Sequence, residues 1–467
     1  MYRDGPKTQI KVIPVVETIA ADLLTPLAVY LKLSAGQDHS FLLESVAGGT
    51  SLARYSFIGA GPERIVEGGR EAYEGLREHF AENEADADAE LPAFIGGAIG
   101  YLGFDACEWF ETSLSRGDAT GDIAFMFYKT IVAFDHAKQV VKIISLVFKG
   151  GTESESQLAE LIAAAEERNR SVRVSLESGE LAIPENRSDE IAVDVISNWK
   201  REAFEEAVVQ IKELIAAGEC YQTVLSQCFT RHTNASHVAI YRALRSLNPS
   251  PYMFLLDLGG KQVIGASPEM LVRCEDAKLE YRPIAGTRKR GKTPVEDGEL
   301  AEEMRLDKKE VAEHMMLVDL GRNDLGRVAE YGSVTVDTLM SVEKYSHVQH
   351  LVSSLSAKLR NGLDRFDALA SCFPAGTVSG APKVRSVEII RDLEPTPRGV
   401  YAGAVGYFDY TGNMDTCIAI RTLVLENGVA KIQAGAGIVA DSVPELEFEE
   451  TVNKAKVLLR AVEIAER

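Results

Sequence analysis

A glycine-rich segment near the end of the chain could bind an anion. Gly435-Ala436-Gly437-Ile438-Val439-Ala440 has the Gly-x-Gly-x-x-Ala spacing of a dinucleotide-binding turn. Such a turn needs a strand that leads directly into a helix. Here the turn-forming residues 441–444 intervene, so the spacing does not predict a nicotinamide or flavin site. Instead, we expect the backbone N–H groups of a Gly-Ala-Gly turn to bind a smaller anion.

Two acidic pairs could hold a metal ion. Glu447, Glu450 and Lys454 are three and four residues apart, so they share one face of a predicted helix. A solvated face with an intrahelical ion pair is an equally simple interpretation. Glu310 and Glu313 form a second pair on another predicted helix. Two carboxylates from different helices, with water and substrate oxygens, are a typical Mg²⁺ site.

Arg421 could also bind an anion. It lies in the apolar segment "CIAIRTLVL", which predicts a strand. Burying an unpaired guanidinium is costly, so Arg421 needs a carboxylate partner. The sequence leaves open whether this partner belongs to the protein or to a ligand.

Strands and helices must position these groups. Phe204, Val208, Ile211 and Ile215 form the apolar stripe of a helix that Gly218 can end. Long helices are predicted at about 299–318 and 445–465. The predicted strands lie within residues 40–46, 54–60, 123–136, 140–148, 220–229, 251–272, 401–425 and 429–440. This pattern predicts an α+β fold, with large and mostly antiparallel sheets covered by helices.

Composition sets further bounds on the function. The 467 residues carry a net charge of −20, which argues against a nucleic-acid or anionic membrane surface. Any anionic substrate therefore needs a local positive site. The six cysteines form no Cys-x-x-Cys pair, no signal-peptide core is visible, and the longest apolar run has 14 residues. We expect a cytoplasmic protein without a membrane span. The polar segment after Gly150 predicts two domains, 1–185 and 190–467.

Eight segments together resemble one enzyme family. They are "LSQCF", "ASPEMLV", "RPIAGTR", "EHMMLVDLGRNDLG", "FPAGTVSGAPK", "YAGAVGYFD", "DTCIAIRT" and "QAGAGIVADSVPELEFEETVNKA", in family order from about residue 195 onward. The chain is similar to the chorismate-binding enzymes. Its N-terminal part adds "FLLES" and "RYSFIG", which resemble the feedback-inhibitor region of the anthranilate-forming members.

The resemblance implies a role for each matching position. Mg²⁺ is expected at Glu313 and Glu450, where it anchors the ring carboxylate of chorismate. The substrate is otherwise held at Gly286, Thr287, Tyr401, Arg421 and the Gly435-Ala436-Gly437 segment. The glycine-rich segment would then bind a carboxylate. A cation, a guanidinium and oriented N–H groups also suit a dianion chemically.

Two positions indicate which reaction is catalysed. Water-adding relatives carry a lysine base where this chain has Gln222, and aminodeoxychorismate synthases usually carry a lysine nucleophile where it has Ala285. Without either lysine, direct attack by ammonia is the consistent route. Glu269 matches the general acid that protonates the departing hydroxyl, and Thr377 lines the same pocket. His350 would transfer a proton during elimination, although a packed core histidine remains an alternative.

The resemblance also implies the pathway and the partners. Ammonia adds to chorismate, pyruvate leaves, and the product is anthranilate, at the first committed step of L-tryptophan biosynthesis. A glutamine amidotransferase subunit would supply the ammonia, in a heterotetramer of two large and two small subunits. Formation of 4-amino-4-deoxychorismate, in the folate pathway, is the alternative.

A separate inhibitor site is expected for tryptophan. It combines Glu44 and Ser45 with Pro251, Tyr252 and Met253. Glu44 could meet an ammonium group, Ser45 an N–H or a carboxylate, and Tyr252 with Met253 an aromatic ring. The alternative is an ordinary strand end that packs on a second strand.

Overall fold

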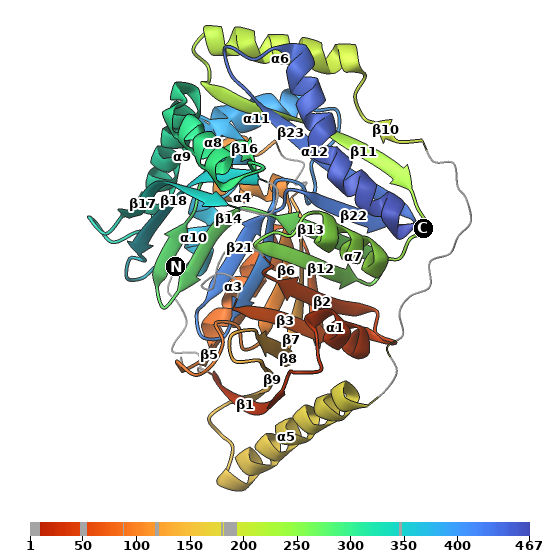
Figure 1. The fold of residues 1–467 in the computed structure, drawn as a ribbon. Coiled ribbons are helices and arrows are strands. Elements are labelled where there is room, and N and C mark those ends of the chain that lie inside the picture. Colours follow the sequence, from red (N-terminus) through yellow and green to blue (C-terminus); the bar gives the residue numbers. More distant parts are fainter. Residues whose placement is uncertain are drawn as a thin grey trace.

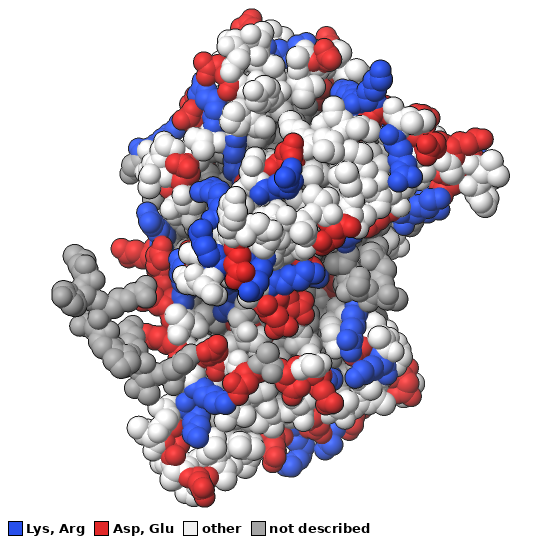
Figure 2. All heavy atoms as spheres, turned by 90° about the vertical axis from the view of Figure 1, so that its left-hand side faces the viewer, with Lys and Arg blue, Asp and Glu red and all other residues white. Residues whose placement is uncertain are grey.

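The computed structural model describes residues 10–46, 54–86, 88–116, 121–178, 181, 194–344 and 348–467. The predicted domain boundary at 185–190 lies outside the described residues. Among the described helices, none combines the length and the hydrophobicity that a membrane span requires. On the face drawn in Figure 2, acidic and basic side chains are interspersed. An anionic ligand would therefore find its positive charge within a site rather than on this face.

The larger of two sheets has 13 strands in the described part of the chain, and its pairing is antiparallel except between β1 and β5. In spatial order its strands are β10 (Ile196–Ser197), β11 (Gln222–His232), β23 (Val429–Ile438), β22 (Thr422–Glu426), β13 (Lys261–Ser267), β12 (Tyr252–Leu258), β2 (His39–Glu44), β3 (Tyr55–Ala60), β8 (Thr130–Asp135), β9 (Val140–Lys149), β1 (Ile10–Ala20) and β5 (Asn83–Ala85), with β19 (Gly380–Ala381) paired to β11. In the two sheets together, the predicted strands are confirmed except around Arg421.

The second sheet has 10 strands in the same described ranges. They are β16 (Ile284–Lys289), β18 (Val348–Lys358), β15 (Lys278–Tyr281), β14 (Met270–Glu275), β21 (Met414–Ile418), β20 (Ala404–Asp409), β6 (Gly97–Leu102), β7 (Ile123–Tyr128) and β4 (Arg64–Gly68), with β17 (Thr335–Lys344) paired to β18. The two halves of the chain share both sheets, because β2 pairs with β12 and β6 pairs with β20.

Helices cover the outer faces of the sheets (Figure 1). They are α1 (Pro26–Ser34), α3 (Arg70–Glu82), α4 (Cys107–Phe110), α5 (Glu155–Glu177), α6 (Arg201–Ala216), α7 (His237–Leu247), α8 (Pro294–Leu306), α9 (Lys308–Gly326), α10 (Arg365–Cys372), α11 (Lys383–Leu393) and α12 (Pro444–Ala465). The predicted stripe of α6 is confirmed, and Gly218 follows it with φ of +83°. The predicted helix at 299–318 is wrong: Asp307 caps a new helix, so α8 and α9 are separate.

The main core fills the space between the two sheets. Phe41 and Phe57 from the larger sheet pack in one cluster with Ile99 and Tyr407 from the smaller sheet, and the Phe57 and Tyr407 ring centres are 5.9 Å apart. The chain passes from the larger to the smaller sheet between β13 and β14, and returns between β21 and β22. These two crossings lie side by side, since the N–H of Ala266 donates to the carbonyl of Arg421 (3.1 Å). The crossings carry two of the residues singled out in the sequence.

Candidate active site

Glu269 lies in the crossing from β13 to β14, and Arg421 lies in the crossing from β21 to β22. The N–H of Ile418 donates to the carbonyl oxygen of Glu269 (3.1 Å), which ties one crossing to the other. The prediction that Arg421 lies in a strand is wrong, because Arg421 lies just before β22 with φ of +50°. A residue in this left-handed region cannot continue a regular strand. The sheet change, which apolar periodicity does not reveal, explains the difference.

Glu269 is a buried carboxyl group in a mixed environment. Only 6% of the residue is exposed. Burial raises the pKa of Glu269 to about 8, although the Thr377 hydroxyl and the charges of Arg421 and Lys454 lower it. At neutral pH this carboxyl group is therefore mostly protonated and can donate a proton. Arg421 and Lys454 face it from two different elements.

Two buried polar atoms of predicted site residues have no hydrogen-bond partner among the described residues: the Oε1 atom of Gln222 and the Oγ1 atom of Thr377. Thr377, in the 3₁₀ turn η3 (Gly376–Val378), lowers the pKa of Glu269 but forms no hydrogen bond with normal distance and angles. We interpret this contact as a close approach. Buried polar groups usually have partners, so both atoms are suited to a ligand.

Gly435-Ala436-Gly437 lies inside strand β23, so the prediction of a turn is wrong. Gly435 is opposite Ser226 and Gly437 is opposite Val224 in strand β11. The N–H groups of Ser226 and Val224 donate away from β23, to Glu394 and Ser379. In an antiparallel pair, the residue opposite such a position also directs its N–H and C=O away from the partner strand.

The N–H groups of both glycines therefore point to the other side of β23. There β22 pairs with β23 only up to Ile432, so this edge is not covered by a strand at the glycines. The carbonyl oxygen of Gly435 on this edge accepts a hydrogen bond from the Lys454 ammonium group (2.9 Å). The segment thus exposes backbone N–H groups as an anion site requires, but from a strand edge rather than from a turn.

The absence of side chains at these glycines makes room for two other groups. A Cβ atom on Gly435 would lie 2.8 Å from the Tyr401 hydroxyl oxygen, and one on Gly437 would lie 2.5 Å from the Gln222 Nε2 atom. Both distances are shorter than van der Waals contact. Tyr401 is buried, and burial raises its pKa to about 12, so its hydroxyl group is a hydrogen-bond donor at neutral pH. Tyr401 and Gln222 thus converge on the glycine strand.

His350 is held by Gly286 at a bulge. Gly286 has φ of +66° and interrupts the register between β16 and β18. Its carbonyl oxygen lies 2.9 Å from the Nδ1 atom of His350. Because a carbonyl only accepts, Nδ1 carries the proton. Burial lowers the pKa of His350; the Gly286 carbonyl opposes this shift, and the Arg421 charge adds to it. Thr287, which pairs with His350, has no described side chain.

The acidic pairs on α9 and α12 face each other. Burial raises the pKa of Glu313, and the carboxylates of Glu310 and Glu450 raise it further. Burial and the charge of Glu450 also raise the pKa of Glu447. Within the described ranges, no three His, Cys, Asp or Glu side chains are close enough to hold a metal by themselves. Two facing carboxylates still suit a Mg²⁺ ion that takes its other oxygens from water and substrate.

Lys454 connects the parts of the site. Its ammonium group lies 2.7 Å from a carboxylate oxygen of Glu450 and also donates a hydrogen bond to the Gly435 carbonyl oxygen. Its charge also lowers the pKa values of Glu269 and Glu313. The spacing of the helix predicted the ion pair. It did not predict the contact with β23, because that contact depends on how α12 packs on the sheet.

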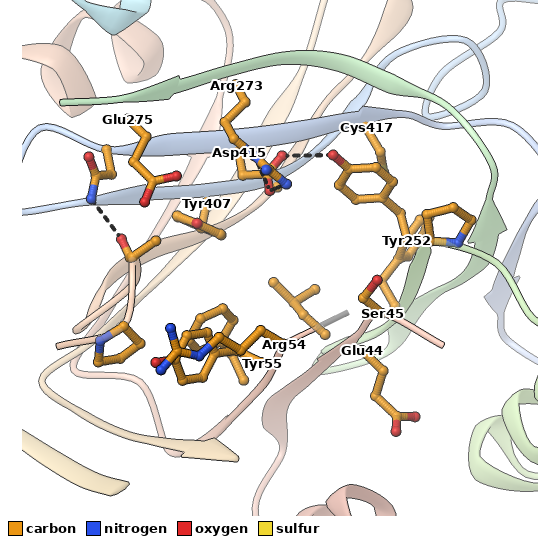
Figure 3. Close-up of a pocket in the computed structure, with 18 of the residues that line it drawn as sticks. Glu44, Ser45, Arg54, Tyr55, Tyr252, Arg273, Glu275, Tyr407, Asp415 and Cys417 are labelled. Atoms are coloured by element: carbon orange, nitrogen blue, oxygen red, sulfur yellow. Dashed lines mark hydrogen bonds and ion pairs between the residues drawn. The ribbon is translucent and has the colours of Figure 1, made fainter. Parts of the chain in front are cut away.

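A cavity of about 590 Å³ lies between the two sheets, and all five predicted inhibitor residues line it (Figure 3). Its walls come from β2, β3 and β12 of the larger sheet and from β14, β20 and β21 of the smaller sheet; they include Tyr55, Arg273, Tyr407, Asp415 and Cys417 as well as Glu44, Ser45, Pro251, Tyr252 and Met253. The Ser45 Oγ atom has no hydrogen-bond partner among the described residues.

Two of the predicted inhibitor residues are already engaged. The Glu44 carboxylate accepts hydrogen bonds from Tyr241 and Arg245, and in Figure 3 it points away from the labelled side chains across the cavity. The Tyr252 hydroxyl donates to Asp415 (3.1 Å), which Arg273 also holds. Glu44 thus supports the wall of the cavity with its side chain.

Fold and site together define an α+β protein with a buried carboxylic acid and a strand edge that exposes backbone N–H groups. The sequence model of the chorismate binding enzymes matches residues 25–460, and the chain belongs to this family. Among its relatives are two proteins named anthranilate synthase component 1. The one from Bacillus caldotenax is 42% identical and the alignment covers 98% of this chain and 95% of the relative. The one from Aquifex aeolicus (strain VF5) is 44% identical, with 97% and 95% covered.

One solved structure gives the same family, and a second gives the same fold. Anthranilate synthase component I from Streptococcus pneumoniae TIGR4 is 36% identical and superposes with a TM-score of 0.77, over 95% of this chain and 99% of that chain. The menaquinone-specific isochorismate synthase MenF from Escherichia coli superposes with a TM-score of 0.73 over 98% and 96%. At 22% identity, this second likeness concerns the fold alone.

Proposed function

We propose that this chain is the chorismate-converting component of an anthranilate synthase, which forms anthranilate and pyruvate from chorismate and ammonia. The observation that carries the proposal is the match, at 42–44% identity and over nearly the whole chain, to proteins named anthranilate synthase component 1. The site agrees with it, because Gln222 and Ala285 stand where a lysine would serve water addition or covalent attack.

The substrate is a dianion, and the site offers positive groups on several sides. The Arg421 guanidinium, the Tyr401 hydroxyl and the N–H groups of Gly435 and Gly437 would bind its carboxylates. All of these donors are fixed by the fold before the substrate enters, so little reorganisation is needed in the transition state. Gly286 and Thr287 would close the site from β16.

Proton transfer falls to Glu269 and His350. Glu269, with its pKa raised by burial to about 8, protonates the departing ring hydroxyl. The orphaned Gln222 Oε1 atom accepts a hydrogen bond from ammonia without removing its proton. His350 is neutral, because burial lowers its pKa, so it can accept a proton when pyruvate is eliminated. Thr377 lines the same space beside Glu269.

Glu313 and Glu450 would hold a Mg²⁺ ion. Burial and the neighbouring carboxylates of Glu310 and Glu450 raise the pKa of Glu313, which marks a place that is short of positive charge and fits a divalent cation. When bound, Mg²⁺ supplies a positive charge for the ring carboxylate of chorismate. Lys454 neutralises part of the same charge from the side of β23.

A separate glutaminase subunit would supply ammonia, since the relatives are named as one component of a synthase. We expect two large and two small subunits. The six cysteines all carry free thiols, which supports a reducing cytoplasm as the location.

Tryptophan would inhibit by filling the cavity between the sheets. The Ser45 hydroxyl offers an unpaired polar atom, and the rings of Tyr55, Tyr252 and Tyr407 provide an aromatic lining. Because Glu44 is engaged by Arg245 and Tyr241, it would fix the Ser45 backbone rather than meet the ligand ammonium group.

Product analysis tests the function. The purified chain with chorismate, Mg²⁺ and an ammonium salt at alkaline pH should form fluorescent anthranilate and pyruvate in equal amounts. Glutamine should replace ammonium only after a glutaminase subunit is added. Accumulation of 4-amino-4-deoxychorismate would instead identify the folate-pathway reaction, and isochorismate would identify water as the nucleophile.

A further inference from the structure

The edge of β11 that faces away from β23 is covered by other strands only at its two ends. β19 pairs with Gln222 and Thr223, and β10 pairs with Phe229 and Thr230. Within the described part of the chain, no strand pairs with residues 224–228 on this edge. Unpaired backbone groups inside a protein are costly, so other groups must satisfy this stretch.

Two charged side chains take the place of the missing strand. The Arg398 guanidinium donates to the carbonyl oxygen of Val224 (2.8 Å), and the Glu394 carboxylate accepts from the N–H and the hydroxyl group of Ser226 (both 2.8 Å). Arg398 and Glu394 also pair with each other (2.6 Å), and their side chains are only 1% and 4% exposed. This buried pair therefore holds the part of β11 that lies opposite the glycine segment of β23.

Arg398 also holds two neighbouring parts of the active site. Its guanidinium donates to the carbonyl oxygen of Val378 (2.7 Å), the residue after Thr377. Its own carbonyl oxygen accepts from the N–H of Tyr401 (3.2 Å), which closes a β-turn, and its guanidinium lies 5.5 Å from the Tyr401 ring centre. Burial raises the pKa of Tyr401, and the Arg398 charge opposes this rise. One side chain thus joins the segments that carry Gln222, Thr377 and Tyr401.

The pair is built for fixed geometry rather than for stability. Pro395 and Pro397 stand between Glu394 and Arg398 and fix the backbone φ angles of this short segment. A buried ion pair adds little net stability, because removing both charges from water costs about as much as their attraction returns. A planar guanidinium, however, can bond a carboxylate and two carbonyl oxygens at once in one defined arrangement.

We propose that Arg398, held by Glu394, is a positioning residue for the carboxylate-binding side of the active site. It sets the Tyr401 hydroxyl against Gly435, where a Cβ atom would lie 2.8 Å from the hydroxyl oxygen. The guanidinium directs its hydrogen bonds to protein acceptors, so it acts through Tyr401 and the glycine strand. The inference rests on the proposed function, in which these groups bind a carboxylate of chorismate.

Steady-state kinetics of Arg398→Lys test this role. Lysine keeps the positive charge beside Glu394, but a single ammonium group cannot span Glu394, Val224 and Val378. The KM for chorismate should rise about tenfold, the usual loss for one hydrogen bond to a charged group. The KM for ammonium should change less than about twofold, and kcat less than about threefold, because Tyr401 binds chorismate in the ground and transition states alike. A chorismate KM within twofold of the wild type would overturn the proposal.

Arg365→Lys, in α10, is the matched control. The Arg365 side chain is also buried (7% exposed), but it pairs with Asp409 (4.0 Å) and donates to the carbonyl oxygen of Asn413 (3.1 Å), outside the active site. This variant should lose stability as Arg398→Lys does, yet keep the KM for chorismate. An equal rise of that KM in both variants would contradict a positioning role, because general loss of stability would then explain it.

Two further variants show whether Arg398 acts through its neighbours. Glu394→Gln keeps an acceptor for the Ser226 N–H but weakens the pair, so it should raise the chorismate KM in the same direction. Tyr401→Phe should raise it as well, and the combination with Arg398→Lys should raise it clearly less than the product of the two single effects. An unchanged KM in Glu394→Gln, or fully multiplicative effects in the double variant, would exclude the proposed action.

Fluorine NMR tests the position of Tyr401 independently of the reaction. In the chain labelled with 3-fluorotyrosine, the Tyr401 signal is the one that disappears in Tyr401→Phe. Without chorismate, Arg398→Lys should shift this signal and Arg365→Lys should not. A shifted signal in a chain that makes no anthranilate would refute the proposed function but keep the positioning role. An unshifted signal would reject the positioning role, whatever the product.

Discussion

The carboxyl group of Glu269 gains its reactivity from its surroundings at the cost of stability. Burial keeps it protonated near neutral pH, while Thr377, Arg421 and Lys454 stabilise its ionised form. The family resemblance predicts Glu269 as the acid, and that role stays a prediction; the sequence could not give its pKa. That value depends on contacts with residues 108 to 185 positions away in the chain, which only the folded sheets bring together.

Glu269→Gln should abolish catalysis and stabilise the fold. Loss of a general acid commonly costs ~10²- to 10⁴-fold in kcat. Because the folded pKa is raised from 4.5 to about 8, the wild type loses stability as pH rises through this window, by at most about 5 kcal/mol. Glutamine cannot ionise, so the variant should have the higher Tm at pH 8, and the difference should shrink toward pH 4.5.

Kinetics and calorimetry between pH 4.5 and pH 8 measure the loss of kcat and the difference in Tm. Glu160→Gln, at an exposed position of α5, is the control and should change neither quantity. For the wild type, kcat at saturating free ammonia should fall above pH 8, where Glu269 loses its proton. A Gln variant with more than a tenth of the wild-type kcat would exclude Glu269 as the acid.

Glu313→Gln and Glu450→Gln should each lower Mg²⁺-dependent turnover by ~10²-fold or more, since each removes charge that the metal needs. Far-ultraviolet circular dichroism should be unchanged. Glu449→Gln is the control, because the Glu449 carboxylate is adjacent in the sequence to Glu450 but is exposed and pairs with Arg201. A Mg²⁺ titration of activity should show a raised half-saturation in the site variants only. Turnover within threefold of the wild type would disprove the metal assignment.

At the scale of single elements, the sequence predicted strands and helices better than it predicted their ends. The apolar alternation of β23 was visible, yet its glycines suggested a turn, because glycine signals turns in most local contexts. Here glycine is needed for close approach to Tyr401 and Gln222 instead. The break at Asp307 was missed for a similar reason: one capping residue outweighs the helical pattern on both sides.

Gly286→Ala should disturb the bulge that orients His350. Its φ of +66° is strained for alanine, and the new Cβ would lie 3.2 Å from a Glu310 carboxylate oxygen. We expect a loss of about 1 to 3 kcal/mol in the free energy of unfolding and a lower kcat. Gly298→Ala is the matched control, since the space around Gly298 in α8 is open and alanine favours helix. Urea unfolding measures both, and equal stability of the two variants would contradict a strained bulge.

At the scale of the whole molecule, the two halves of the chain form one pair of sheets. The sequence suggested two consecutive domains, because composition changes after Gly150. The pairing of β2 with β12 and of β6 with β20 joins segments more than 200 residues apart. Local patterns carry no signal for such pairs, so neither the shared sheets nor the cavity between them could be predicted from periodicity.

Tryptophan should bind between the sheets, and chorismate with Mg²⁺ should weaken its binding. A coupling of ~1 to 3 kcal/mol corresponds to about 5- to 150-fold in affinity, and it must be equal in both directions. Calorimetric titration of tryptophan, with and without chorismate and Mg²⁺, measures it. Ser45→Phe fills the cavity and should abolish the heat of binding while the chain remains active. Normal tryptophan affinity in that variant would place the inhibitor elsewhere.

The paired crossings give this arrangement a mechanical consequence. Glu269 and Arg421 lie where the chain changes sheets, and the cavity opens between those same sheets, with Cys417 in its wall one residue before Ile418, which bonds to Glu269. The crossings therefore link the wall of the cavity to the acid and the guanidinium through the backbone. We expect a molecule that fills the cavity to displace both groups, so that an inhibitor would disable catalysis without ever touching chorismate.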